Sequence, residues 1–372
     1  MAAALKHRWS IGNNYLAGIT AGDWWRLLRK NRFAVAPAYW HRAAFITLAS
    51  VINSMYRRRE DRQYKSQIEQ TEIREAPLFI LGHWRSGTTL LHYLLAQDTE
   101  QFAFANTYQV VNPYTFLSTE ETNTRRFAQL VPSTRPMDNM QQSFGTPQED
   151  EFAPLLMTLR SLYLGITFPR NQAKYTPYMT FEGVPHEEIE EWKGALLWFC
   201  KKLTLKYGRP LVLKSPPHTA RIRLLLELFP QARFVHIHRD PYRVFQSQRH
   251  YFDTAIWYTY LQRPDRSLVD AGILKRYSTM YDAYFKDLAL IPEGQFHEVR
   301  FDDLERDPVG EVQRIYEQLR IGGFDEFRPR LQVYADSLVQ YQKNEFSPLP
   351  EFDRNQVAAA WSRNFKTWNY PV

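Results

Sequence analysis

Cysteine and long apolar runs are what this 372-residue sequence has least of. Its one cysteine, Cys200, excludes an intrachain disulfide and favours a reducing compartment. The N-terminus shows neither the apolar core nor the small-residue cleavage site of a secretory signal, and no N-x-[ST] glycosylation acceptor occurs. These absences favour a cytoplasmic protein over a secreted one.

The overall charge is only moderately unbalanced, with a net charge of +7. Hydrophobic residues make up 44% of the chain and aromatic residues 15%, which is typical of a globular protein rather than a disordered one. A modest positive balance suits an anionic small molecule or an anionic membrane surface. It is too diffuse to indicate binding to nucleic acid.

The N-terminal region differs from the rest in charge. Residues 1–59 carry ten lysine or arginine residues against one acid, Asp23. Between Arg42 and Arg57 lies a mostly apolar stretch of fourteen residues, fewer than the roughly 20 that a membrane-spanning helix needs. Flanking arginines and tryptophans are typical of a helix lying in a membrane interface. The alternative is a helix packed on the protein's own core with its basic side in solvent.

Apolar runs and helical patterns alternate through the rest of the chain. Residues 77–82 form a continuous apolar run, as a strand covered on both faces requires. Similar runs end at Lys214 and Arg239, and a late strand is expected in "QFHEVRFDD". Helices are expected between them, at residues 87–96, 186–206, 218–230 and 241–252. Residues 97–185 predict loops with short helices. The alternation predicts an α/β fold with a mostly parallel sheet.

The first strand runs into the loop "GHWRSGTT", which fits the phosphate-binding pattern G-x-x-x-x-G-x-[ST]. Gly82 and Gly87 take the glycine places and Thr89 the hydroxyl place. Thr88 stands where a nucleoside-triphosphate-hydrolysing loop has lysine. Backbone N–H groups at the start of the following helix still suit an anion, and Arg85 adds a positive charge from inside the loop.

Two further strand ends carry cations. Lys214 ends one strand in "RPLVLKSP", and Arg239 ends another in "ARFVHIHRDP". Ser247 follows Arg239 by eight residues, about two turns into the next helix. The carboxyl ends of parallel strands form the crevice where open α/β sheets bind ligands. We expect Arg239 and Ser247 to hold a second phosphate there.

The segments "RSGTT", "LKSP" and "HRDPYRVFQS", in this order and strand context, resemble the sulfotransferase family, and its broad bacterial branch most. The donor of that family is 3′-phosphoadenosine 5′-phosphosulfate. The resemblance implies a P-loop-like three-layer fold, with helices on both faces of a mostly parallel central sheet. It assigns Arg239 and Ser247 to the 3′-phosphate. It also assigns the family's 5′-phosphosulfate loop to Arg85, Ser86, Gly87, Thr88 and Thr89.

The chemistry implied by the resemblance is transfer of a sulfuryl group to an acceptor hydroxyl, without a metal. Lys214 and Arg85 suit the stabilisation of the departing 5′-phosphate. For the general base the sequence leaves two alternatives. One is His218 in "KSPPH", and the other is the acidic cluster "PQEDEF", in which Glu149 or Glu151 removes the proton.

The acceptor and the domain division follow from the same features. We expect residues 1–75 to be a basic helical extension that contacts the inner face of the membrane, and residues 76–372 to be the sulfotransferase domain. A lipid, sterol-like or glycan hydroxyl is then the expected acceptor. Two alternative functions remain, an ATP-dependent small-molecule kinase and an inactive nucleotide-binding protein at the membrane surface.

Overall fold

A parallel five-stranded sheet lies at the centre of the computed structural model, which describes residues 5–130, 134–135, 137–338 and 344–372. The spatial order of the strands is β2-β3-β1-β4-β5, and every neighbouring pair is parallel. The strands are β1 (Leu78–Leu81), β2 (Ala103–Phe104), β3 (Leu211–Lys214), β4 (Arg233–His238) and β5 (Phe296–Arg300). The predicted α/β fold with a parallel sheet is therefore confirmed.

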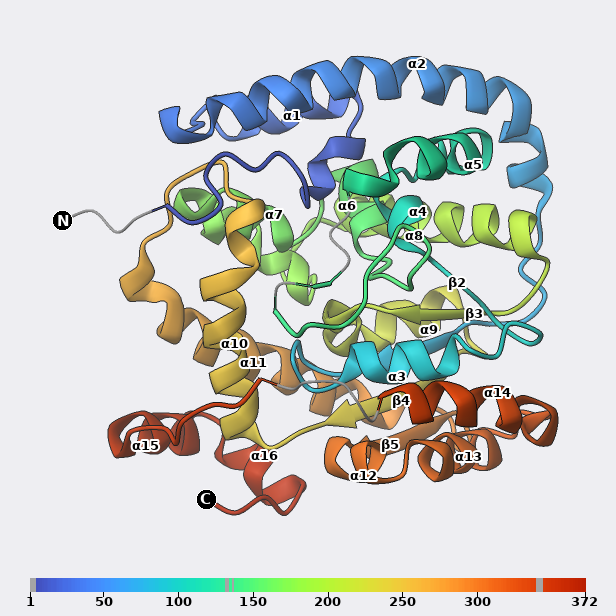
Figure 1. Ribbon diagram of the computed structural model, residues 1–372, viewed down its shortest axis with the longest axis vertical. Coiled ribbons are helices and arrows are strands. Elements are labelled where there is room, and N and C mark those ends of the chain that lie inside the picture. Colours follow the sequence, from blue (N-terminus) through green and yellow to red (C-terminus); the bar gives the residue numbers. More distant parts are fainter. Residues whose placement is uncertain (1–4, 131–133, 136, 339–343) are drawn as a thin grey trace.

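Helices cover both faces of this sheet, so the strands are apolar on both sides. Phe79 and Leu81 pack into one core cluster, whereas Leu78 and Ile80 pack into the other. Figure 1 shows helices of both groups packed around the strands. The first layer includes α8 (His186–Tyr207), α9 (Ile222–Leu228) and α11 (Val269–Asp287). The second includes α3 (Thr88–Leu95), α12 (Phe301–Arg306), α13 (Pro308–Gln318) and α14 (Phe324–Ser337).

The segment between β1 and β3 is longer and less regular. It contains α4 (Thr107–Val111), α5 (Phe116–Phe127), α6 (Phe152–Thr158) and α7 (Tyr163–Thr167). It also contains β2, which the sequence did not predict because two residues give no measurable alternation. After β4 the chain also forms α10 (Pro241–Thr254), α15 (Glu351–Ala360) and α16 (Ser362–Thr367).

The N-terminal region forms α1 (Ala21–Lys30) and the long α2 (Trp40–Gln70), which lie along one edge of the molecule (Figure 1). The expected apolar stretch and the polar stretch after it are one continuous helix. The inner sides of both helices belong to the main core, because Leu27 of α1 and Ile46 of α2 are buried there. Among the described residues, no helix is both long and apolar enough to cross a bilayer.

His83, His92 and His238 are three of the buried histidines around β1 and β4. Burial lowers the pKa of His83, His92 and His238 to about 3, so all three are neutral in the folded protein. An unfolded chain takes up these protons below about pH 6.5 while the folded chain does not. Stability is therefore complete above that pH and falls as the pH drops from 6.5 towards 3.

We predict that each of these histidines costs about 1.4 kcal/mol of unfolding free energy per pH unit below 6.5. Urea unfolding between pH 7.5 and 5.0 measures the slope. The variant His92→Gln removes one titrating group, and its slope should be shallower by about that amount. An unchanged slope in this variant would contradict the neutral state of His92.

Candidate active site

The loop between β1 and α3 has the backbone of an anion-binding cradle. Arg85 (φ 73°) and Gly87 (φ 105°) both lie in the left-handed region, which turns successive N–H groups inward. Gly87 must be glycine, since a Cβ there would collide with the ring of Phe301. The Ser86 hydroxyl donates to the carbonyl of His83 at 2.8 Å and holds the turn. Thr88 and Thr89 begin α3 directly after it.

Arg85 and Ser247 come together although 162 residues separate them. Arg85 Nε donates to the Ser247 hydroxyl at 2.9 Å, and its Nη1 forms an ion pair with Asp138 at 2.8 Å. Burial acts to raise the pKa of Asp138, but Arg135 and Arg85 outweigh it, so the pKa lies below its usual value. Asp138 is therefore a carboxylate that balances the loop arginine.

Arg239 lies at the carboxyl end of β4, with its guanidinium 4.0 Å from the centre of the Phe301 ring. Burial lowers the pKa of this group, with Glu305 acting in the opposite direction. Within the described ranges no hydrogen bond from the protein reaches its side chain. A desolvated cation with free donors, packed on the same ring that Gly87 approaches, fits a phosphate group.

Lys214 ends β3 and pairs in register with Ile80 of β1, which places it next to the loop. Its side chain is buried, and Nζ donates to Glu149 Oε1 at 3.3 Å. Burial lowers the pKa of Lys214, and the neighbouring Glu149 carboxylate partly offsets this. A second cation thus faces the cradle from the adjacent strand.

Glu149 connects this lysine to the loop. The Tyr163 hydroxyl donates to Glu149 Oε2 and accepts a hydrogen bond from Trp84 Nε1 at 2.7 Å. Burial, and then the charge of Glu149, raise the pKa of Tyr163 well above its usual value, which keeps the hydroxyl protonated. The Glu149 side chain remains 14% exposed. It is a carboxylate at the surface of the cradle.

The other candidate bases are directed into the interior. His218 is fully buried, and its Nε2 lies 2.6 Å from Asp150 Oδ2. Glu151 is also fully buried and accepts two hydrogen bonds from Arg221, at 2.6 and 3.0 Å. Both groups are closed off in fully buried pairs, whereas the Glu149 side chain is partly exposed.

An aromatic stack supports Tyr163 from the N-terminal region. Tyr15 stacks on Phe152 with ring centroids 5.1 Å apart, and Phe152 stacks on Tyr163 at 5.2 Å. The Tyr15 hydroxyl also donates to the backbone carbonyl of Tyr163 at 3.1 Å. The first turn of the chain thus helps to fix the residue that holds Glu149.

Several site residues were not predicted from the sequence. Asp138 and Trp84 lie in loops, and Tyr163 begins the short helix α7. Of these three, only Tyr163 is one of the aromatic side chains in which residues 97–185 are rich. Most aromatics of residues 97–185 are core residues: nine are buried, namely Phe102, Tyr108, Tyr114, Phe116, Tyr163, Phe168, Tyr175, Tyr178 and Phe181.

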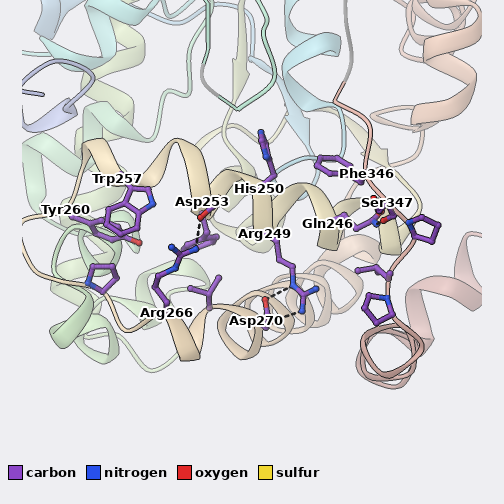
Figure 2. A pocket seen from close by; sticks show the side chains of 16 residues that line it. Gln246, Arg249, His250, Asp253, Trp257, Tyr260, Arg266, Asp270, Phe346 and Ser347 are labelled. Carbon is purple, nitrogen blue, oxygen red and sulfur yellow. Dashed lines mark hydrogen bonds and ion pairs between the residues drawn. The ribbon is translucent and has the colours of Figure 1, made fainter. Parts of the chain in front are cut away.

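A cavity of about 530 Å³ lies along α10, between that helix, α11 and residues 346–350 (Figure 2). At one end it is lined by Gln246, the neighbour of Ser247, and at the other by Trp257 and Tyr260. Its charged side chains are paired, Arg249 with Asp270 and Arg266 with Asp253, each at 2.6 Å. The cavity therefore offers aromatic side chains and paired charges, and it extends to the neighbour of Ser247.

The parallel sheet and the glycine loop at the carboxyl end of β1 define a P-loop-like fold. Residues 77–326 match the model of the sulfotransferase family. The chain is also 36% identical, over 357 residues, to the omega-hydroxy-beta-dihydromenaquinone-9 sulfotransferase Stf3 of Mycobacterium bovis and of Mycobacterium tuberculosis. That alignment covers 95% of this chain and 90% of those proteins. The chain belongs to the sulfotransferase family, as the sequence motifs predicted.

Solved structures agree on the fold. Sulfotransferase STF1 of Mycobacterium tuberculosis superposes with a TM-score of 0.63 at 16% identity, covering 94% of each chain. STF9 of Mycobacterium avium gives a TM-score of 0.66 at 17% identity, covering 95% of this chain and 98% of its own. The predicted P-loop-like three-layer architecture is confirmed.

The cradle itself can be tested with a pair of glycine variants. Gly87→Ala places a Cβ at positive φ and against Phe301, and we expect it to lower the unfolding free energy by about 2–4 kcal/mol. Gly194→Ala is the control, because Gly194 lies within α8 with no atom near its missing Cβ. The control should be neutral or slightly stabilising. Equal thermal stability of the two variants would contradict this loop geometry.

Proposed function

We propose that the enzyme transfers the sulfuryl group of 3′-phosphoadenosine 5′-phosphosulfate to a hydroxyl of a lipid acceptor. The observation that supports the proposal is the placement of Arg85 in the loop after β1 and of Lys214 and Arg239 at the ends of the two strands that flank β1. Two phosphate positions follow from it, with the 5′-phosphosulfate at residues 85–89 and the 3′-phosphate at Arg239 and Ser247. The absence of lysine at Thr88 fits a ligand without β- and γ-phosphates.

The reaction needs a base and a stabilised leaving group. In an in-line transfer the acceptor oxygen bonds to sulfur while the bond between sulfur and the 5′-phosphate oxygen breaks. Lys214 and Arg85 stabilise the charge that develops on that phosphate oxygen. No group of three or more His, Cys, Asp or Glu side chains in the described part of the chain is arranged to hold a metal ion. We propose a metal-free transfer.

We assign the base to Glu149. Of the candidates Glu149, Glu151 and His218, only Glu149 has a partly exposed side chain, and its carboxylate contacts Lys214. When Lys214 turns its hydrogen bonds to the donor phosphate, Glu149 is released to take the proton of the acceptor hydroxyl. Tyr163 keeps the carboxylate in place during this exchange. His218 and Glu151 then have structural roles in their buried pairs.

The lipid acceptor is proposed from the relatives and from the surface of this chain. The 36% identical relatives are named for a menaquinone-derived lipid alcohol. The cavity along α10 provides aromatic surface for an apolar chain, with Trp257 and Tyr260 at its far end. We propose that the protein acts in the cytoplasm, at the inner surface of the membrane. A sterol-like or glycan hydroxyl is the alternative that an acceptor assay would reveal.

The donor is tested by calorimetry with 3′-phosphoadenosine 5′-phosphate against ATP and Mg²⁺. We expect metal-independent binding of the bisphosphate, and a loss of at least tenfold in affinity in Arg239→Ala. Transfer of labelled sulfate to a lipid extract tests the acceptor. A preference for ATP with Mg²⁺ would indicate the kinase alternative, and bisphosphate binding without any transfer would indicate an inactive binding protein.

The base is tested by comparing two isosteric variants. Glu149→Gln should lower kcat by about 10²–10⁴-fold, because the amide cannot accept the proton, while binding of the bisphosphate persists. His218→Gln is the matched variant, and its kcat should stay within tenfold of the wild type in protein that remains folded. The assignment fails if the two variants show the reverse pattern in single-turnover kinetics.

A further inference from the structure

Large apolar side chains are exposed in a row on the outer side of α1, α2 and the turn between them. This outer surface is defined by Trp25, Phe33, Trp40, Leu48, Val51, Ile52 and Met55, whose exposed fractions range from 49% to 71%. On α2 they recur at steps of three, four and eight residues, opposite the buried Arg42, Ile46 and Ser50. Figure 1 shows the two helices at the edge of the molecule, with no other element outside them.

The charges around this surface are of one sign. Asp23 is the only acid before Glu60, and it is buried and bonded to Arg26. Exposed arginines border the apolar row, and no ion pair to an acid is found for them in the part of the chain that the structure describes. These are Arg29, Arg32, Arg58 and Arg59. An apolar surface with an unbalanced cationic rim is complementary to negative charge above an apolar layer.

We propose that this outer surface docks on an anionic phospholipid bilayer. Tryptophan side chains suit the boundary between headgroups and acyl chains, and arginines suit anionic headgroups. Two copies of the chain meeting through this surface would instead bring their arginines together, which favours the bilayer over self-association. Since no described helix is able to span a bilayer, the contact is peripheral.

The docking surface also leads towards the proposed active site. At the start of α2, the Arg42 side chain turns inward and donates to the backbone carbonyls of Trp257 and Tyr260, at 2.8 and 3.0 Å. These two residues line one end of the cavity along α10, and Gln246 beside Ser247 lines the other (Figure 2). A lipid entering at the docked side would thus reach the donor site along α10. This route rests on the proposed lipid acceptor, whereas docking itself does not.

Docking is tested with the full chain and with vesicles of phosphatidylcholine alone or with 30% phosphatidylglycerol, as a composition of about one anionic lipid in three. We expect the wild type to sediment with the anionic vesicles, and less so as salt is raised. The variant Leu48→Gln/Ile52→Gln/Met55→Gln should lose at least tenfold in partition coefficient. The control Val333→Gln/Phe352→Gln changes equally exposed residues on α14 and α15 and should bind as the wild type does.

The outcomes separate docking from catalysis. Sulfate transfer to a short-chain, water-soluble alcohol should be equal in the wild type and the triple variant, while transfer to a vesicle-embedded alcohol should fall with binding. The proposal is overturned if the wild type ignores anionic vesicles, or if the triple variant sediments as well as the wild type. It is also overturned if the triple variant only converts a dimer to a monomer in light scattering. Vesicle binding without any sulfate transfer would refute the proposed function alone.

Discussion

The parallel alignment of β3, β1 and β4 is the constraint on which the site depends. Because the three strands run in one direction, their carboxyl ends meet at one edge of the sheet. The glycine loop, Lys214 and Arg239 are each placed by the end of one of these strands. The chain moves to the opposite side of β1 between β3 and β4, which opens the crevice there. If one strand shifted by one residue, its cationic side chain would point into one of the apolar layers that cover the sheet.

Collecting cations in a desolvated crevice requires carboxylates nearby. Asp138 balances Arg85, and Glu149 balances Lys214. Arg239 instead rests on the face of the Phe301 ring. An anionic donor would compete with the two carboxylates for their cations. In the reaction proposed above, the competition that makes room for the donor would also free Glu149 for the acceptor proton, which would couple donor binding to proton removal.

Much of the fold was predictable because its strands are continuous apolar runs bounded by glycine, proline or charge. The ends of β3 and β4 were located at Lys214 and near Arg239, and the loop residues were identified from their spacing. The three adjacent acids were harder. Glu149 contacts Lys214, Asp150 contacts His218, and Glu151 contacts Arg221. These three consecutive acids, just before α6, thus contact three different partners. Their burial depends on residues that are distant in the sequence.

Asp138 and Tyr163 were not predictable for a related reason. Their segments show neither a helical nor a strand period, so only the folded chain brings them to Arg85 and Glu149. The division into an N-terminal extension and a main domain stays a prediction. The inner sides of α1 and α2 nevertheless share the core that also contains Phe79 and Trp192.

The ring stack from Tyr15 through Phe152 to Tyr163 has a practical consequence for anyone who wishes to handle the protein in solution. Deleting the N-terminal region with its exposed apolar side chains would also remove the Tyr15 ring from the stack. It would also remove the hydrogen bonds of Arg42 beneath α2. A truncated chain would therefore lack part of the support of Tyr163 and would not represent the intact enzyme. A more soluble variant should therefore replace only the exposed apolar side chains of α1 and α2 and keep the buried side chains of the same helices.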